Sequence, residues 1–251
     1  MAGHSKWANI KHRKASQDAR RGKEFQKHIR AIMVAAKEGG ADPALNIRLK
    51  AALERAKAVN VPSDNIEKAI RKGVGDVEGV LFEEITYEGY GSGGVAVLVE
   101  ALTDNRNRTA SEIRLLFSRA GGSLGESGCV SWLFERRGLV MVTGDSLEEE
   151  ELLSHCIDSG ASDVQKTQGG FSVFCDPSDI AAVRDGLVSA GYVVESADID
   201  MTPKTTVPVT KKEDAEKIFR FMEHLEDQDD VQNVYANFDI PDELMDELAQ
   251  I

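Results

Sequence analysis

The first part of the chain places its apolar residues at helical spacing behind a polar opening stretch. From about residue 17, these apolar side chains share one helical face: Phe25, Ile29, Ile32, Met33 and Ala36. A Gly-Gly pair ends this helix, and a second helix follows, with Asp42 as its cap and Leu45 among its buried residues. A third begins near Pro62. The pattern therefore predicts a basic flexible tail over residues 1–19 and a helical domain over residues 20–74.

Beyond a linker that contains Gly and Asp, the pattern changes to alternating strands and helices. Four segments are predicted: strands over 85–88 and 95–102, a helix over 109–120 and a strand over 129–134. The capping box Thr109-x-x-Glu112 opens the helix. The polar run 135–138 then breaks the pattern after the last strand.

Residues 139–200 predict a complete unit of six elements. The predicted segments are a strand over 139–142, a helix opened by Ser146-x-x-Glu149, strands near 163–166 and 171–175, a helix over 178–190 and a strand over 192–199. Their order is β-α-β-β-α-β, which is the ferredoxin-like arrangement.

The last part of the chain predicts only a strand over 205–209, a helix opened by Thr210-x-x-Glu213 and a strand over 231–238. A half sheet with two open edges would be poorly covered alone. Residues 80–135 plus 204–241 are therefore predicted to form one discontinuous α/β domain, with residues 138–202 inserted as a second one. Strictly sequential domains are the alternative, but they leave the end of the chain without an evident core.

The predicted fold class is thus α+β, with an N-terminal three-helix domain followed by two ferredoxin-like α/β domains, the last one inserted into the middle one. Residues 89–94 satisfy G-x-G-x-x-G. A dinucleotide fingerprint needs such glycines to open a helix. Here they lead into the apolar run Val95–Val99, so they predict a turn between two strands.

Composition excludes several classes of protein. The chain has 251 residues, of which 41% are hydrophobic, enough for one large domain or two to three small ones. Cys129, Cys156 and Cys175 form no C-x-x-C pair, which argues against a disulfide framework and a Cys-based zinc site. No apolar run approaches the ~18 residues of a spanning helix, and no signal-peptide core follows the first charges. We expect a cytoplasmic protein without metal or cofactor, and no enzyme, because recognisable catalytic motifs are absent.

Positive charge is concentrated at the N-terminus of a chain whose net charge is −13. Residues 1–75 contain 17 Lys/Arg and 7 Asp/Glu, whereas residues 76–251 contain 13 and 36. This asymmetry indicates a polyanion-binding segment carried by an acidic body. The candidate nucleic-acid-binding residues are Lys6, Lys11, Arg13, Lys14, Arg20, Arg21, Lys23, Lys27 and Arg30.

Two other interpretations of the basic segment stay open. Its Lys and Arg side chains can simply solvate a helix face, or the segment can dock on the protein's own acidic domains in a closed state that competes with binding. The acid run 148–151 is interpreted as the opening turn of a helix, and the run 223–230 as a solvated helix end and loop. Neither has the spacing of metal ligands.

Secondary contacts are predicted at four positions. Trp7 either stacks on a base or anchors the tail in a groove, and His12 adds a phosphate contact. Arg106 and Arg108 lie at a helix start, where backbone N–H groups favour anions.

The second and third helices superficially suggest a helix-turn-helix. The outward residues of its recognition helix would be Asn65, Lys68, Arg71 and Lys72. Three helices around one core are also the ordinary way to build a small helical domain. Insertion of this helix into the major groove is therefore the less favoured interpretation.

Three long segments together resemble the YebC/PmpR family of bacterial proteins, to which a mitochondrial translational activator also belongs. These segments are GHSKWANIKHRKASQDARRGKEFQK, LERAKAVNVPSDNIEKAIRKG and YEGYGSGGVAVLVEALTDNRNRT. The similarity extends over essentially the whole chain. It implies three domains, one helical and two α/β, and polynucleotide binding, as a transcriptional regulator on DNA or in translation at the ribosome. It implies no catalytic residues.

The leading hypothesis is a nucleic-acid-binding regulator, with DNA as its partner in transcription. The alternative is a ribosome-associated translation factor that binds ribosomal RNA. No membrane partner is expected, and a monomer is favoured.

Overall fold

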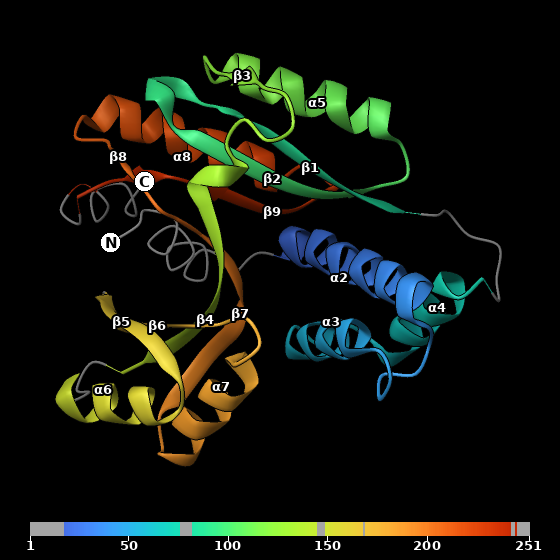
Figure 1. Cartoon of the computed structure of the whole chain (residues 1–251). Coiled ribbons are helices and arrows are strands. Elements are labelled where there is room, and N and C mark those ends of the chain that lie inside the picture. The colour runs from blue at the N-terminus through green and yellow to red at the C-terminus, as the bar shows by residue number, and fades with distance from the viewer. Residues whose placement is uncertain (1–17, 76–81, 145–148, 168, 242–243, 245–251) are drawn as a thin grey trace. The chain divides into compact units, whose positions relative to one another are not determined.

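A computed structural model of the chain describes residues 18–75, 82–144, 149–167, 169–241 and 244. Three helices come first, and two four-stranded sheets with their helices follow in the described part of the chain (Figure 1). The sheets contain antiparallel pairs, such as β1 with β2 and β4 with β6. The predicted α+β class is therefore confirmed.

The helical region consists of α2 (Asp18–Gly39), α3 (Ile47–Ala58) and α4 (Ser63–Gly73), with α3 and α4 both packed on α2. The buried residues of its core are Ile32, Ala35, Ala36, Leu49, Ala52, Ala56, Val61, Ile66 and Ala69. Gly73 permits the close approach of α4 to α2, because a Cβ at this position would lie 2.5 Å from the carbonyl oxygen of Met33.

Asn46, and not Asp42, caps the second helix. The Asn46 side chain accepts a hydrogen bond from the Leu49 N–H at 2.9 Å and donates to the carbonyl oxygens of Ala35 and Gly40, both at 2.8 Å. The predicted burial of Leu45 is wrong, since this residue is 84% exposed. Leu45 precedes the cap, so the helical spacing of α3 does not extend to it.

The first sheet has the strand order β3-β1-β2-β9, and its strands are β1 (Glu83–Tyr90), β2 (Ala96–Thr103), β3 (Ser123–Leu124) and β9 (Val231–Ala236). Its helices are α5 (Arg106–Arg119) and α8 (Lys212–Glu226). They pack together through Phe117 and Phe221, whose rings meet edge to face with centroids 4.9 Å apart. The short 3-10 helix η1 (Ser92–Gly94) joins β1 to β2, which confirms that the glycine-rich motif is a turn between strands.

The second sheet has the order β5-β6-β4-β7. Its elements follow the chain as β4 (Phe134–Thr143), α6 (Glu149–Asp158), β5 (Ala161–Thr167), β6 (Gly170–Cys175), α7 (Ile180–Ser189) and β7 (Val193–Pro203). This is the predicted β-α-β-β-α-β order. Val140, Val173, Leu152 and Leu187 are among the residues of its core.

Three predicted strand limits are wrong. The segment 129–134 contains the short 3-10 helix η2 (Ser131–Leu133), and the strand begins only at Phe134. The run 135–138 lies inside β4 and does not break it, because its backbone pairs with β7 from Thr202 to Ile199. The predicted strand 205–209 shrinks to β8 (Val207–Pro208), which pairs in parallel with β10 (Phe238–Asp239) and not with the first sheet.

The described residues divide into two compact units. One lies within residues 11–130 and 210–234, and the other within residues 131–209 and 235–251. The domain limits expected from the sequence stay a prediction.

Both predicted capping boxes that fall on described residues are wrong. Asn105 caps α5 by accepting a hydrogen bond from the Arg108 N–H at 3.1 Å, and Thr109 lies inside the helix. Helix α8 begins after Lys211, without a side-chain cap from Thr210. The predicted cap at Ser146 lies outside the described residues.

The substitution Asn46→Ala should lower the free energy of unfolding by about 1–3 kcal/mol, because it removes a helix cap and leaves two carbonyl groups without their donor. Urea unfolding followed by circular dichroism measures this loss. Thr210→Ala is the matched control: it should change stability by less than about 0.5 kcal/mol. An equal loss in both variants would contradict the assignment of the cap.

Candidate nucleic-acid interface

The structure describes part of the predicted basic segment. Outside the described residues lie Lys6, Trp7, Lys11, His12, Arg13 and Lys14. Arg20 and Arg21 belong to α2, but their side chains are not described. Lys23, Lys27 and Arg30 are described, and they lie on one side of α2 because their spacing is i, i+4 and i+7. We call these three residues the α2 stripe.

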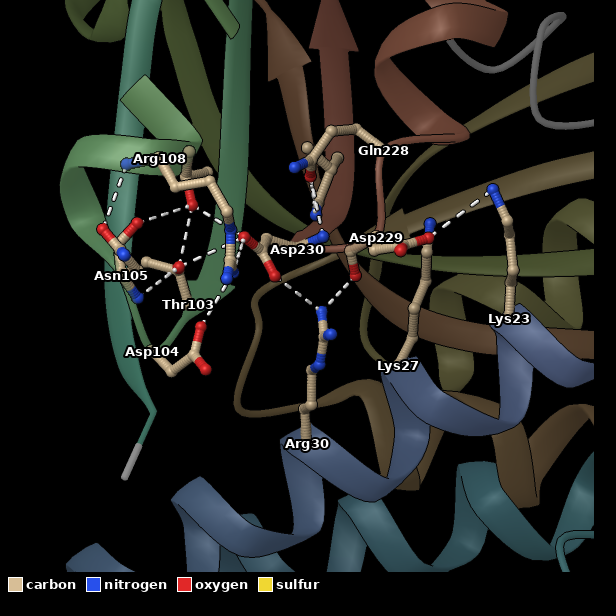
Figure 2. Close-up of polar contacts among 12 residues, drawn as sticks. Lys23, Lys27, Arg30, Thr103, Asp104, Asn105, Arg108, Gln228, Asp229 and Asp230 are labelled. Carbon is tan, nitrogen blue, oxygen red and sulfur yellow. Dashed lines mark hydrogen bonds and ion pairs between the residues drawn. The ribbon is translucent and has the colours of Figure 1, made fainter. Parts of the chain in front are cut away.

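The α2 stripe contacts residues 226–230, which end α8 and lead into β9 (Figure 2). We call this segment the 226–230 turn. Lys23 Nζ donates to the Asp227 carbonyl oxygen at 2.9 Å and lies 3.5 Å from an Asp229 carboxylate oxygen. Lys27 Nζ donates to the Glu226 carbonyl oxygen at 2.8 Å. Two of the predicted phosphate-binding cations therefore bind protein oxygens here.

The position of these lysines follows from the chemistry of a helix end. The last carbonyl groups of a helix have no partner within the helix and carry partial negative charge. Glu226 is the last residue of α8 and Asp227 its cap, so their carbonyl oxygens are acceptors of this kind. Lysine side chains near such an end bind these oxygens and complement the helix dipole.

Arg30 makes the most buried contact of the stripe. Its Nη1 lies 3.0 Å from Asp230 Oδ1, and the same nitrogen donates to the Asp229 carbonyl oxygen. The guanidinium also lies over the Phe82 ring, 5.2 Å from the centroid, in a cation–π arrangement. Its side chain is 17% exposed.

Asp230 is a buried carboxylate that is held from several directions (Figure 2). Its side chain is 1% exposed. Oδ2 accepts from Arg108 Nη2 at 2.7 Å, and the hydroxyl oxygens of Thr109 and Thr103 lie 2.7 and 3.1 Å away. Burial alone would raise the pKa of the Asp230 carboxyl, but hydrogen bonds from Arg108 and Thr109, with the charge of Arg30, lower it. The group is therefore charged at neutral pH.

The two arginines predicted as secondary contacts differ in their surroundings. Arg108 donates to Asp104 and Asp230, both at 2.7 Å, so it serves the buried carboxylate. Arg106 is 67% exposed and forms a longer ion pair with Glu83, at 3.7 Å. Of the two, Arg106 is the more accessible to a ligand.

Sequence reasoning missed Asp230. The acid run 223–230 is interpreted as a solvated helix end, and this is wrong for Asp230. Its partners Arg30 and Arg108 lie 200 and 122 residues away in the chain. The only sequence feature that pointed to this site is the polar loop 103–109, because it combines hydroxyl and arginine side chains at a helix start.

The outward residues of α4, Asn65, Lys68, Arg71 and Lys72, are exposed as predicted. Helices α3 and α4 both pack on α2, around which the core of the region forms. This arrangement agrees with a small helical domain as well as with a DNA-reading motif. It assigns no bases to α4.

Other chemistry is limited within the described residues. They hold no group of three or more His, Cys, Asp or Glu side chains that could bind a metal ion, and no helix there is long and apolar enough to cross a membrane. Burial raises the pKa of the Cys156 thiol to about 11 and also raises that of Cys175. Both cysteines are therefore protonated, poorly nucleophilic thiols at neutral pH.

Asp230→Asn should lower the free energy of unfolding by about 2–4 kcal/mol, because a neutral amide replaces a buried carboxylate that is paired with two arginines. Chemical unfolding compared with wild type measures this. Asp229→Asn, at a carboxylate that is 69% exposed, should change stability by less than about 0.5 kcal/mol. Equal effects would contradict the central role of Asp230.

The stability gained from the Asp230 charge should depend on pH. Because its pKa is lowered in the folded protein, this stability is fully present above the unfolded value of about 3.9 and is lost as pH falls through the folded pKa. The difference in unfolding free energy between wild type and Asp230→Asn should therefore shrink below about pH 4. A difference that stays constant from pH 7 to pH 3 would contradict the lowered pKa.

Comparison with known proteins covers the whole length of the chain. Residues 5–76 match the model of the TACO1/YebC N-terminal domain, and residues 82–238 match that of the TACO1/YebC second and third domain. A "probable transcriptional regulatory protein" of Dictyoglomus turgidum is 52% identical over 250 residues, which cover 99% of this chain and all of the relative. One of the same description from Geobacter sulfurreducens is 52% identical over 248 residues, with 99% and 100% covered.

The crystal structure of a conserved hypothetical protein from Aquifex aeolicus has a similar fold. Its TM-score is 0.81 at 49% sequence identity, and the match covers 89% of this chain and 92% of that one. The two domain models and the relatives matched over their full length thus indicate the same family. The chain belongs to the TACO1/YebC family.

Proposed function

We propose that this chain is a non-enzymatic regulatory protein that binds DNA through its basic N-terminal segment. The observation that carries the proposal is the charge distribution: residues 1–75 contain 17 Lys/Arg against 7 Asp/Glu in a chain of net charge −13. Relatives over the full length are named probable transcriptional regulatory proteins, which supports DNA as the partner.

Phosphate neutralisation supplies the binding energy in this proposal. Each Lys or Arg that contacts a phosphate releases condensed counterions, so affinity falls steeply with salt. The nine cations of residues 1–30 face only two acids in the same stretch. The acidic remainder of the chain repels a polyanion and directs it to this segment.

The second candidate partner is ribosomal RNA. The resemblance to a family that includes a mitochondrial translational activator favours it, and phosphate contacts by themselves do not distinguish DNA from RNA. Arg106, exposed at the start of α5, is a secondary contact with either partner.

Charge reversal of the N-terminal segment should strongly weaken binding. With about six phosphate contacts, wild type should show a log-log salt slope near −5 for duplex DNA and lose roughly a thousandfold in affinity between 50 and 200 mM salt. A variant with six Glu substitutions should bind weakly and with a flattened slope. The substituted positions are Lys11, Arg13, Lys14, Arg20, Arg21 and Lys23. Fluorescence anisotropy with duplex DNA, structured RNA and ribosomes as competitors measures both quantities.

A control variant carries the same change in net charge on exposed residues elsewhere. Its substituted positions are Arg114, Arg119, Arg136, Lys204, Lys211 and Lys217. This control should bind far more tightly than the N-terminal variant, because it leaves the proposed contacts in place. Equal losses of affinity in the two variants would contradict the proposal, because binding would then depend on net charge alone. A loss found only with Lys68→Glu, Arg71→Glu and Lys72→Glu would move the contact to α4.

A further inference from the structure

The 226–230 turn presents the α2 stripe with a row of oxygen acceptors. The three cations contact two kinds of oxygen there: the carbonyl oxygens of Glu226, Asp227 and Asp229, and the carboxylates of Asp229 and Asp230. A phosphate backbone offers a comparable row of anionic oxygens to lysine and arginine. We propose that the 226–230 turn competes with nucleic acid for the α2 stripe, so that binding requires Lys23 and Lys27 to leave the turn. This inference rests on the proposed function.

The contacts of Lys23 and Lys27 are suited to exchange. Lys23 is 54% exposed and its partner carboxylate on Asp229 is 69% exposed. Ion pairs between exposed groups contribute little to stability and are screened by salt. Lys27 is only partly buried, and its Nζ donates to a helix-end carbonyl oxygen that water can also satisfy. Both ammonium groups can therefore move to a phosphate at a small cost in free energy.

Arg30 is suited to stay in place. Its guanidinium binds the buried Asp230 carboxylate and covers Phe82, and its side chain is 17% exposed. Removing a charged partner from a buried carboxylate is costly. Arg30 therefore acts as the fixed end of the stripe, from which Lys23 and Lys27 exchange between turn and ligand.

Hydrogen bonds of the Gln228 side chain also hold the turn. The Gln228 side-chain oxygen accepts from the N–H groups of Asp230 and Val231, at 2.7 and 3.0 Å, and its amide nitrogen donates to Glu112 at 2.6 Å. These bonds involve no residue of the α2 stripe. The turn is thus a preformed acceptor surface to which the lysines can return when the ligand leaves.

The test removes the two exposed aspartate charges of the turn and leaves the buried Asp230 unchanged. Asp227→Asn with Asp229→Asn removes two exposed negative charges and keeps both backbone carbonyl groups. Affinity for duplex DNA and structured RNA at 50 mM salt should rise about twofold to fivefold, and the gain should shrink at 200 mM salt as screening weakens the competitor. Fluorescence anisotropy of the full chain with each labelled probe measures the change.

Two comparisons separate competition from a general charge effect. Glu126→Gln with Glu213→Gln gives the same change in net charge at exposed positions outside the turn, and should give little or no gain. In a background of Lys23→Gln with Lys27→Gln, which itself binds more weakly, neutralising the turn should bring no gain, because the competing cations are absent.

Equal gains from the turn variant and its control, or a gain that persists without Lys23 and Lys27, would overturn the inference alone. No gain from the turn variant in a protein that binds with the expected salt slope would do the same. If the protein binds neither probe, or if charge reversal of its N-terminal segment leaves affinity unchanged, the proposed function fails and the inference fails with it.

Discussion

The arrangement around the candidate interface depends on one buried negative charge. A carboxylate that is 1% exposed would be strongly unfavourable without compensation. At Asp230 the compensation comes from α2 through Arg30, from the end of β2 through Thr103 and from the start of α5 through Arg108 and Thr109. The need to satisfy one carboxylate therefore fixes where three separate elements meet the start of β9.

This constraint gives the basic residues of α2 two different roles. Arg30 belongs to the compensation of Asp230, whereas Lys23 and Lys27 bind the rim of the same turn through exposed or partly buried contacts. A count of positive charges in the sequence treats all three alike. In the folded protein the side chain of Lys23 is 54% exposed and that of Arg30 is 17% exposed, so Arg30 is less available to a ligand than Lys23.

The sequence predicted what depends on local pattern. The α+β class, the three helices and the β-α-β-β-α-β order follow from periodicities of 3.6 and 2 and from glycine-rich turns. The sequence-based predictions were wrong where a residue has a partner far away in the sequence. Thr109 matches a capping box, but its hydroxyl faces Asp230, and the strand 134–143 extends through a polar run because β7 pairs with it. The candidate interface residues were predicted from charge alone. Their contacts with the 226–230 turn were not predicted, because about 200 residues separate the partners.

Asn46 has a consequence for the chemical ageing of the protein. Its amide acts at once as acceptor, toward the Leu49 N–H, and as donor, toward the carbonyl oxygens of Ala35 and Gly40. Aspartate is an equally good helix cap on a surface. Hydrolysis of this buried amide would place a carboxylate oxygen against two carbonyl oxygens and turn two hydrogen bonds into repulsions. A one-atom change that most helix starts tolerate would here weaken the contact between the start of α3 and the end of α2.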